Sequence, residues 1–195
     1  TGPPHQPCLA GRAWTWDGVR FEWLHPVAEP GPRTRPNAGS CVLRVDAGPG
    51  RRLLLTGDIE AAQEAALIAR TCRAGVRPCD ALHADLLVMP HHGSRGSGSA
   101  PFLAAVAPRL ALIQAGRDNR YGHPHPQTLA RLAAAGVPWV ASPDCGAWAW
   151  RSERSLTRAT CHRHEARRYW HAPVPALVQA GPELAKPWSS EGIPP

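Results

Sequence analysis

Three short apolar runs, each followed by a cluster of polar residues, constrain the fold of this chain most strongly. The runs are Leu53–Thr56, Leu86–Met89 and Leu110–Gln114. Helical patterns alternate with them, from Asp58 onward, over Pro101–Val106 and over Gln127–Ala135. Strands that alternate with helices predict an α/β domain with a partly parallel sheet. Because Leu53–Leu55 shows no polar alternation, we expect that strand to be covered on both faces.

Strand pairs without helices between them come first in the chain. Ala13–Trp16 and Val19–Leu24 flank Asp17-Gly18, a typical hairpin turn. Cys41–Asp46 is expected to pair with Arg52–Thr56, and short strands are expected again at 139–141 and 147–151. The tryptophans are expected in the core rather than on a base-stacking surface: Trp14, Trp16, Trp23 and Trp139.

The length of 195 residues suits one domain. We expect this domain to occupy residues 1–152, followed by a basic, proline-rich and disordered tail over 153–195. The sequence contains no run of 18 apolar residues, so no membrane span is expected in this chain.

The charge is basic, with Lys+Arg 22 against Asp+Glu 15 and a net charge of +7. Such a balance favours polyanionic partners such as nucleic acid or a phospholipid surface, although the excess of arginine over lysine also fits a GC-rich genome. The six cysteines form no C-x-x-C pair, which argues against a zinc site of the usual spacing. Cys72 and Cys79 bracket a loop; they either form a disulfide in an oxidising compartment or remain free thiols.

The polar clusters are expected to meet at one edge of the sheet, because the carboxyl ends of parallel strands share an edge. Asp58, His91, His92 and His123 would then converge, and carboxylate with imidazole suits zinc or manganese. Such an ion lowers the pKa of bound water and provides hydroxide for hydrolysis. Each residue also has a simpler interpretation: Asp58 as a helix N-cap, and the His91-His92 pair as one buried and one solvated side chain.

Taken together, these motifs resemble a known family. LLLTGDIE (53–60), DLLVMPHHGS (85–94) and NRYGHP (119–124) are similar to the metallo-β-lactamase-like domain of ComEC-type DNA internalisation (competence) proteins. The segment WTWDGVRFEWLHP (14–26) and the RYW of 168–170 are similar to the same region. The resemblance implies the second, C-terminal half of an αββα sandwich, in a protein whose channel portion lies in the inner membrane and whose nuclease-like domain faces the periplasm.

The resemblance also implies site residues and a reaction. Asp58 and His92 would be catalytic, and Asp58 with His91 or His92 would hold a divalent zinc or manganese ion. Five residues would face DNA: Ser94, Asn119, Arg120, Tyr121 and His123. The expected activity is metal-dependent hydrolysis of the DNA strand that is not imported during natural transformation.

This chain departs from the family pattern in one respect. The His-x-Asp/His-x-Asp-His run that forms the family's first metal motif does not occur in it. We therefore expect an incomplete site that is inactive in the isolated chain. Two alternatives remain open: a non-catalytic basic module that guides DNA to the channel, and a small-molecule metallo-hydrolase.

Overall fold

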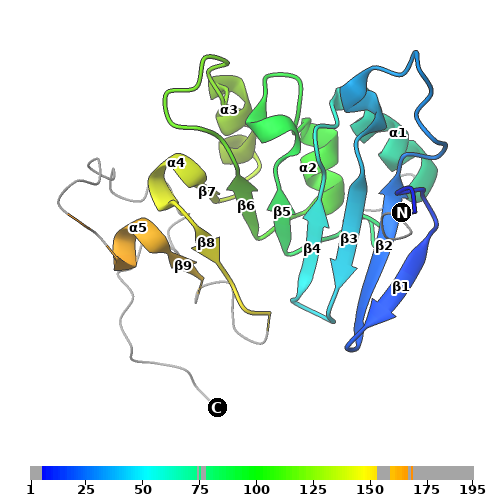
Figure 1. Cartoon of the computed structure of the whole chain (residues 1–195), viewed down its shortest axis with the longest axis horizontal. Coiled ribbons are helices and arrows are strands. Elements are labelled where there is room, and N and C mark those ends of the chain that lie inside the picture. The colour runs from blue at the N-terminus through cyan, green and yellow to red at the C-terminus, as the bar shows by residue number, and fades with distance from the viewer. Residues whose placement is uncertain (1–5, 74, 76–77, 153–158, 167, 169–195) are drawn as a thin grey trace, which may run out of the picture.

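The computed structural model describes residues 6–73, 75, 78–152, 159–166 and 168 (Figure 1). The α/β prediction is confirmed, because a seven-stranded mixed sheet carries helices on one face, as in half of an α/β sandwich. The strands of this sheet are β1 (Ala13–Trp16), β2 (Val19–His25), β3 (Val42–Asp46), β4 (Arg52–Leu55), β5 (Leu86–Val88), β6 (Leu110–Ile113) and β7 (Trp139–Ala141). The helices against it are α1 (Ala61–Thr71), α2 (Ala100–Val106) and α3 (Pro126–Ala134), and two 3-10 turns are η1 (Pro36–Gly39) and η2 (Pro90–Gly93).

The strand order follows the sequence from β1 to β7. β1 to β4 pair antiparallel, whereas β4 to β7 pair parallel. The first hairpin turns at Asp17 and Gly18, which have φ of 49° and 77°, the positive values that a two-residue hairpin turn needs. Since β4, β5 and β6 run parallel, the loops that follow them lie at the same edge of the sheet (Figure 1).

The main core lies between the sheet and the three helices. Leu54 and Leu87 of the central strands are fully buried there, together with Leu67 of α1, Phe102 of α2 and Leu132 of α3. This core fixes the positions of the strands, and through them the positions of the loops at their carboxyl ends.

A buried carboxylate holds the segment between η2 and α2. Glu64 of α1 is fully buried and accepts the backbone N–H groups of Gly98 and Ser99, at 2.6 and 2.9 Å. Ser99 is the N-cap residue of α2, but its side chain makes no capping hydrogen bond. The Arg131 guanidinium of α3 donates to the Gly98 carbonyl from the other side. The loop that follows the two histidines is therefore anchored by a buried anion and a cation.

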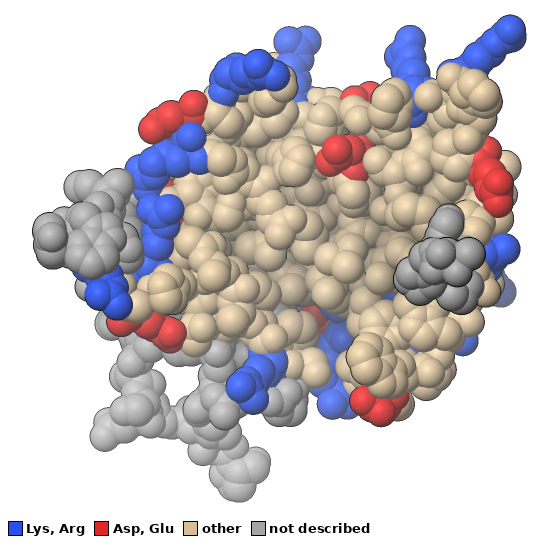
Figure 2. Space-filling view, viewed as in Figure 1, with Lys and Arg blue, Asp and Glu red and all other residues tan. Residues whose placement is uncertain are grey.

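The opposite face of the sheet is apolar and only partly covered. Leu86 and Leu110 are buried there, with Trp148 and Trp150 packed against them. Toward β1 the face opens, and Figure 2 shows Lys and Arg side chains around its rim and few charges at its centre. Trp14 is 41% exposed and Trp16 69% exposed, so the prediction that these two lie in the core is wrong. Apolar residues of this kind mark a face that another surface can cover.

A small hairpin lies beside the parallel end of the sheet. It consists of β8 (Trp148–Ala149) and β9 (Thr160–Cys161), flanked by α4 (Ser142–Cys145) and α5 (His162–Glu165). A disulfide joins Cys145 to Cys161. The elements β9 and α5 thus lie inside the region expected as a tail, whereas 169–195 falls outside the described residues.

All six cysteines form disulfides: Cys8–Cys41, Cys72–Cys79 and Cys145–Cys161. Of the two possibilities for Cys72 and Cys79, the disulfide is the one found. Among the described residues, no helix is long and apolar enough to cross a membrane.

Candidate functional site

The loops after β4, β5 and β6 meet at one edge of the sheet, as the strand order predicts. The His91 N–H donates to the Gly57 carbonyl at 2.9 Å, which ties the loop after β5 to the loop after β4. The His125 N–H donates to the Gly93 carbonyl at 2.8 Å, which ties the loop after β6 to the loop after β5. Asp58, the two adjacent histidines and His123 are therefore brought together by backbone hydrogen bonds.

The two adjacent histidines lie in a left-handed turn. His91 has φ of 48° and His92 of 56°, and Gly93 continues the turn at 74°. A left-handed backbone costs an L-residue about 1–2 kcal/mol, and such strain gathers at functional sites. At Gly93 a side chain would also be crowded, since a Cβ there would lie 3.1 Å from Pro124 Cβ. The hydrogen bonds on both sides of the turn hold the histidines in this conformation.

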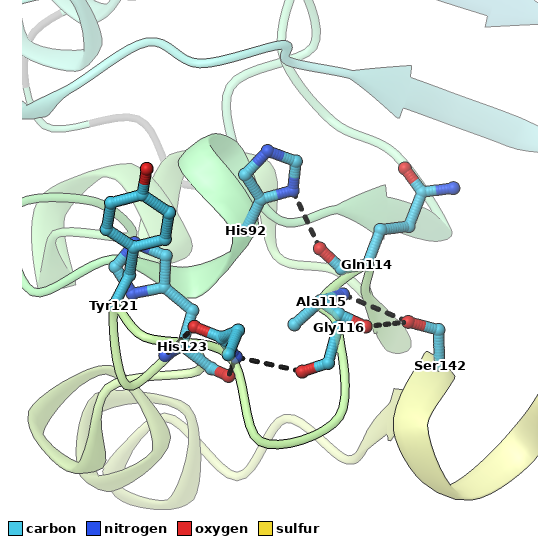
Figure 3. A pocket seen from close by; sticks show the side chains of 8 residues that line it. His92, Gln114, Ala115, Gly116, Tyr121, His123 and Ser142 are labelled. Atoms are coloured by element: carbon cyan, nitrogen blue, oxygen red, sulfur yellow. Dashed lines mark hydrogen bonds between the residues drawn. The ribbon is translucent and has the colours of Figure 1, made fainter.

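His92 faces Asp58. A backbone carbonyl fixes its ring (Figure 3). Its Nδ1 lies 2.7 Å from the Gln114 carbonyl oxygen, so Nδ1 carries the proton. Its Nε2 lies 3.5 Å from Asp58 Oδ1. In the neutral imidazole, Nε2 then presents a lone pair to a carboxylate oxygen. Two acceptors that face each other at this distance can share a cation, a proton or a water molecule.

His91 points toward a second carboxylate. Its Nδ1 lies 3.3 Å from Glu60 Oε1, a distance short enough for an ion pair, but the direction makes no hydrogen bond and Nδ1 is buried. Glu60 Oε1 also accepts from Asn37 Nδ2 at 3.1 Å.

The N-cap of α1 is Glu60, so Asp58 does not cap this helix. Sequence reasoning assigned no role to Glu60 or Asn37; the acid two residues after Asp58 was the available signal for Glu60.

His123 contributes a half-buried imidazole near the other two. Its ring centroid is 5.8 Å from that of His91. Burial lowers the pKa of His123 below its ordinary value, and repulsion by neighbouring His91, His92 and His125 lowers it further. Within the described part of the chain its buried Nδ1 has no hydrogen-bond partner. Both effects favour the neutral form of the His123 imidazole.

The residues expected to face DNA differ in position. Tyr121 is 64% exposed and stacks on His123 with ring centroids 5.9 Å apart, and the guanidinium of exposed Arg120 lies 4.8 Å from the Tyr121 ring centroid. Asn119 instead uses its amide within its own loop, where it bonds to Gly116 and to both backbone groups of His123. Ser94 is buried, at 6% exposure, so its side chain does not lie on an open surface.

A cavity of about 430 Å³ opens beside His92 (Figure 3). Its lining residues come from the loops after β5, β6 and β7: His92, Gln114, Ala115, Gly116, Asn119, Tyr121, His123 and Ser142. The Ser142 hydroxyl accepts the Ala115 N–H and donates to the Ala115 carbonyl, which fixes the wall opposite Tyr121.

Over the described ranges, no cluster of three or more His, Cys, Asp or Glu side chains is placed to hold a metal ion. The residues present offer at most a pair of ligands, Asp58 and His92, to a divalent cation. This pair fits part of a metal site, since the 3.5 Å separation of Nε2 and Oδ1 is close to that of neighbouring ligands on one zinc ion.

The chain is similar to four curated proteins. It is 37% identical over 142 residues to the uncharacterized protein YcaI of Escherichia coli (strain K12), and 38% identical over 138 residues to competence protein ComA of Neisseria gonorrhoeae. These matches cover 73% and 71% of this chain but 18% of each relative. It is also 40% identical over 126 residues to recombination protein 2 of Haemophilus influenzae (strain ATCC 51907 / DSM 11121 / KW20 / Rd), covering 64% of this chain and 14% of that protein.

No family model matches the chain. It spans less than a fifth of the length of the curated relatives it matches, with shares of 18%, 18% and 14%. One of these relatives is named a competence protein and another a recombination protein. The chain is therefore similar to a short segment of longer proteins, among them a competence protein and a recombination protein.

Proposed function

We propose that this chain belongs to a DNA-uptake protein and that its site acts on the DNA phosphodiester backbone, as a metallo-β-lactamase-like nuclease. The observation that carries the proposal is the pair of acceptors formed by His92 Nε2 and Asp58 Oδ1, 3.5 Å apart. Because the Gln114 carbonyl holds the proton of neutral His92 on Nδ1, the Nε2 lone pair is free to bind a cation together with Asp58 Oδ1.

A divalent ion between these groups would polarise a phosphoryl oxygen and lower the pKa of a bound water. The chain's own residues would orient the substrate. The stack of Tyr121 on His123 offers aromatic surface to a base. Exposed Arg120, beside Tyr121, offers positive charge to the DNA backbone.

The site needs further ligands than this pair. We propose that they come from a segment that packs on the apolar face of the sheet, where Trp14 and Trp16 are exposed. Such a segment would complete a sandwich of two sheets and bring its own ligands to the same edge. The isolated chain is then expected to bind metal weakly and to cleave slowly or not at all.

The proposed location is the periplasmic face of the inner membrane, next to a transmembrane channel portion of the same protein. The pairing of all six cysteines supports it, because disulfides persist in oxidising compartments. The net charge of +7 supports a nucleic-acid partner over a small-molecule substrate.

The test couples metal to DNA binding. Affinity for labelled single-stranded DNA is measured by fluorescence anisotropy with manganese and with a chelator, and the two are compared at each of several salt concentrations. We expect manganese to strengthen binding by the unaltered chain and by the control Asp80→Asn, an exposed aspartate away from the site. Asp58→Asn and His92→Gln should abolish this increase.

A metal-independent affinity that Asp58→Asn leaves unchanged would contradict the nuclease-like site and identify a module that only guides DNA. Absence of DNA binding at every salt concentration would contradict both functions.

A further inference from the structure

The cavity beside His92 has a chemistry distinct from that of the acceptor pair next to it. None of its eight lining residues is Lys, Arg, Asp or Glu. Its volume of about 430 Å³ is within the range of small-molecule sites, roughly 300–1,000 Å³. A phosphate group would find no permanent cation among these residues, so the cavity suits an uncharged part of a ligand.

The hydrogen-bonding groups of the lining are largely used within the protein. The Asn119 amide is bonded to Gly116 and His123, and the Ser142 hydroxyl to both backbone groups of Ala115. The Gln114 side chain and the Tyr121 hydroxyl also belong to the lining. The Tyr121 hydroxyl accepts a hydrogen bond from the Arg120 guanidinium. A site with an aromatic wall and few free hydrogen-bonding groups binds a planar ring by stacking. It discriminates little between rings that differ in the hydrogen-bonding groups at their edges.

The position of the cavity relates it to the backbone site. His92 lines the cavity with its ring and faces Asp58 with Nε2. In Figure 3, Tyr121 and His123 stand on one side of the cavity and Ser142 on the other. A DNA phosphate held at the acceptor pair would thus leave its neighbouring nucleoside next to the opening.

We infer that this cavity accepts one unstacked nucleobase and thereby selects single-stranded DNA over duplex. The inference rests on the proposed function, since the phosphate beside the base is the one held near Asp58 and His92. Bases in a duplex are stacked and paired, so none of them can enter without being pulled out of the helix. Recognition by shape and stacking leaves the site tolerant of base identity.

The chain offers a matched pair of substitutions to test this. Gly116 lines the cavity, its φ is not positive, and a Cβ there would lie 3.7 Å from Asn119 Cβ, an ordinary contact. Gly116→Val therefore fills the cavity without straining the backbone. Gly96→Val is the control, because Gly96 also lacks a positive φ, has nothing within 4 Å of its Cβ position and does not line the cavity.

The experiment compares a short oligothymidylate with an abasic oligonucleotide of the same length, with and without manganese and at several salt concentrations. The unaltered chain should bind the oligothymidylate about tenfold more tightly than the abasic strand, as base stacking on an aromatic side chain allows. Gly116→Val and Tyr121→Ala should remove this preference and bind both strands like the unaltered chain binds the abasic one. Gly96→Val and Tyr121→Phe, which keeps the ring, should retain it.

Equal binding of the two strands by the unaltered chain would overturn the base site, while salt-dependent binding of both would still support the proposed contact with the DNA backbone. A base preference that survives Gly116→Val would place base recognition elsewhere and would also overturn the inference. Failure to bind either strand would contradict the proposed function itself.

Discussion

Replacing either histidine of the left-handed turn by glycine should stabilise the chain relative to replacing it by alanine. His91 and His92 have φ of 48° and 56°, where an L-residue is strained and glycine is not. Alanine and glycine both remove the imidazole and its contacts. The difference between the two variants at one position therefore isolates the backbone term.

The magnitude follows from two opposing effects. Relief of left-handed strain gains about 1–2 kcal/mol, and the greater freedom of glycine in the unfolded chain costs about 0.5–1 kcal/mol. We expect the glycine variant to be more stable than the alanine variant by about 1 kcal/mol at each position. The opposite sign is expected at Ala62, an exposed residue of right-handed α1, where glycine costs about 1 kcal/mol relative to alanine.

The assay is urea unfolding followed by tryptophan fluorescence, with the free energy of unfolding obtained by linear extrapolation. The slope against urea should be the same for each pair of variants, so that the midpoint reports stability. If alanine equals or exceeds glycine in stability at both histidines, the turn is not left-handed in solution and the link between strain and site fails. If it is left-handed, each glycine variant is more stable than its alanine counterpart, and both variants at His92 lose the response of DNA binding to manganese.

Three further predictions concern the elements that hold the site. Glu64→Ala should lower the free energy of unfolding by about 3 kcal/mol, since it removes two hydrogen bonds to a buried carboxylate. Urea unfolding measures this free energy. A loss smaller than that of an average surface substitution would contradict the anchoring role of Glu64. Burial alone would raise the pKa of Asp46, but the Gly48 N–H and the Arg52 and Arg44 guanidinium groups lower it below 3.8. Its carboxylate should therefore stabilise the fold above pH 3.8 and lose this effect as the pH falls through the lower folded pKa; the gap in melting temperature between Asp46→Asn and the unaltered chain should close at acidic pH, and a constant gap would refute it. Removing the Cys145–Cys161 disulfide, which spans 16 residues, by a double alanine substitution should cost about 3 kcal/mol; a reductant should then lower the melting temperature of this variant less than that of the unaltered chain.

The sequence by itself determined the order and type of the elements around the site. The apolar runs of β4, β5 and β6 are too short for helices and end in polar clusters, so their parallel pairing placed Asp58, His91, His92 and His123 at one edge. The Asp17-Gly18 turn was equally readable, because its positive φ values demand such residues. These features depend on local chemistry and on strand direction, both of which are written in the order of residues.

Only the tertiary structure decided which side chains face each other. His91 and His92 are neighbours in sequence, but the left-handed turn directs one toward Glu60 and the other toward Asp58. The partner that fixes His92 is a backbone carbonyl, that of Gln114, which carries no sequence signature. The burial of Ser94 and the exposure of Trp16 likewise depend on what packs above each face of the sheet. Sequence periodicity assigns residues to a face, whereas burial and side-chain direction arise from elements that are distant along the chain and meet only in the folded protein.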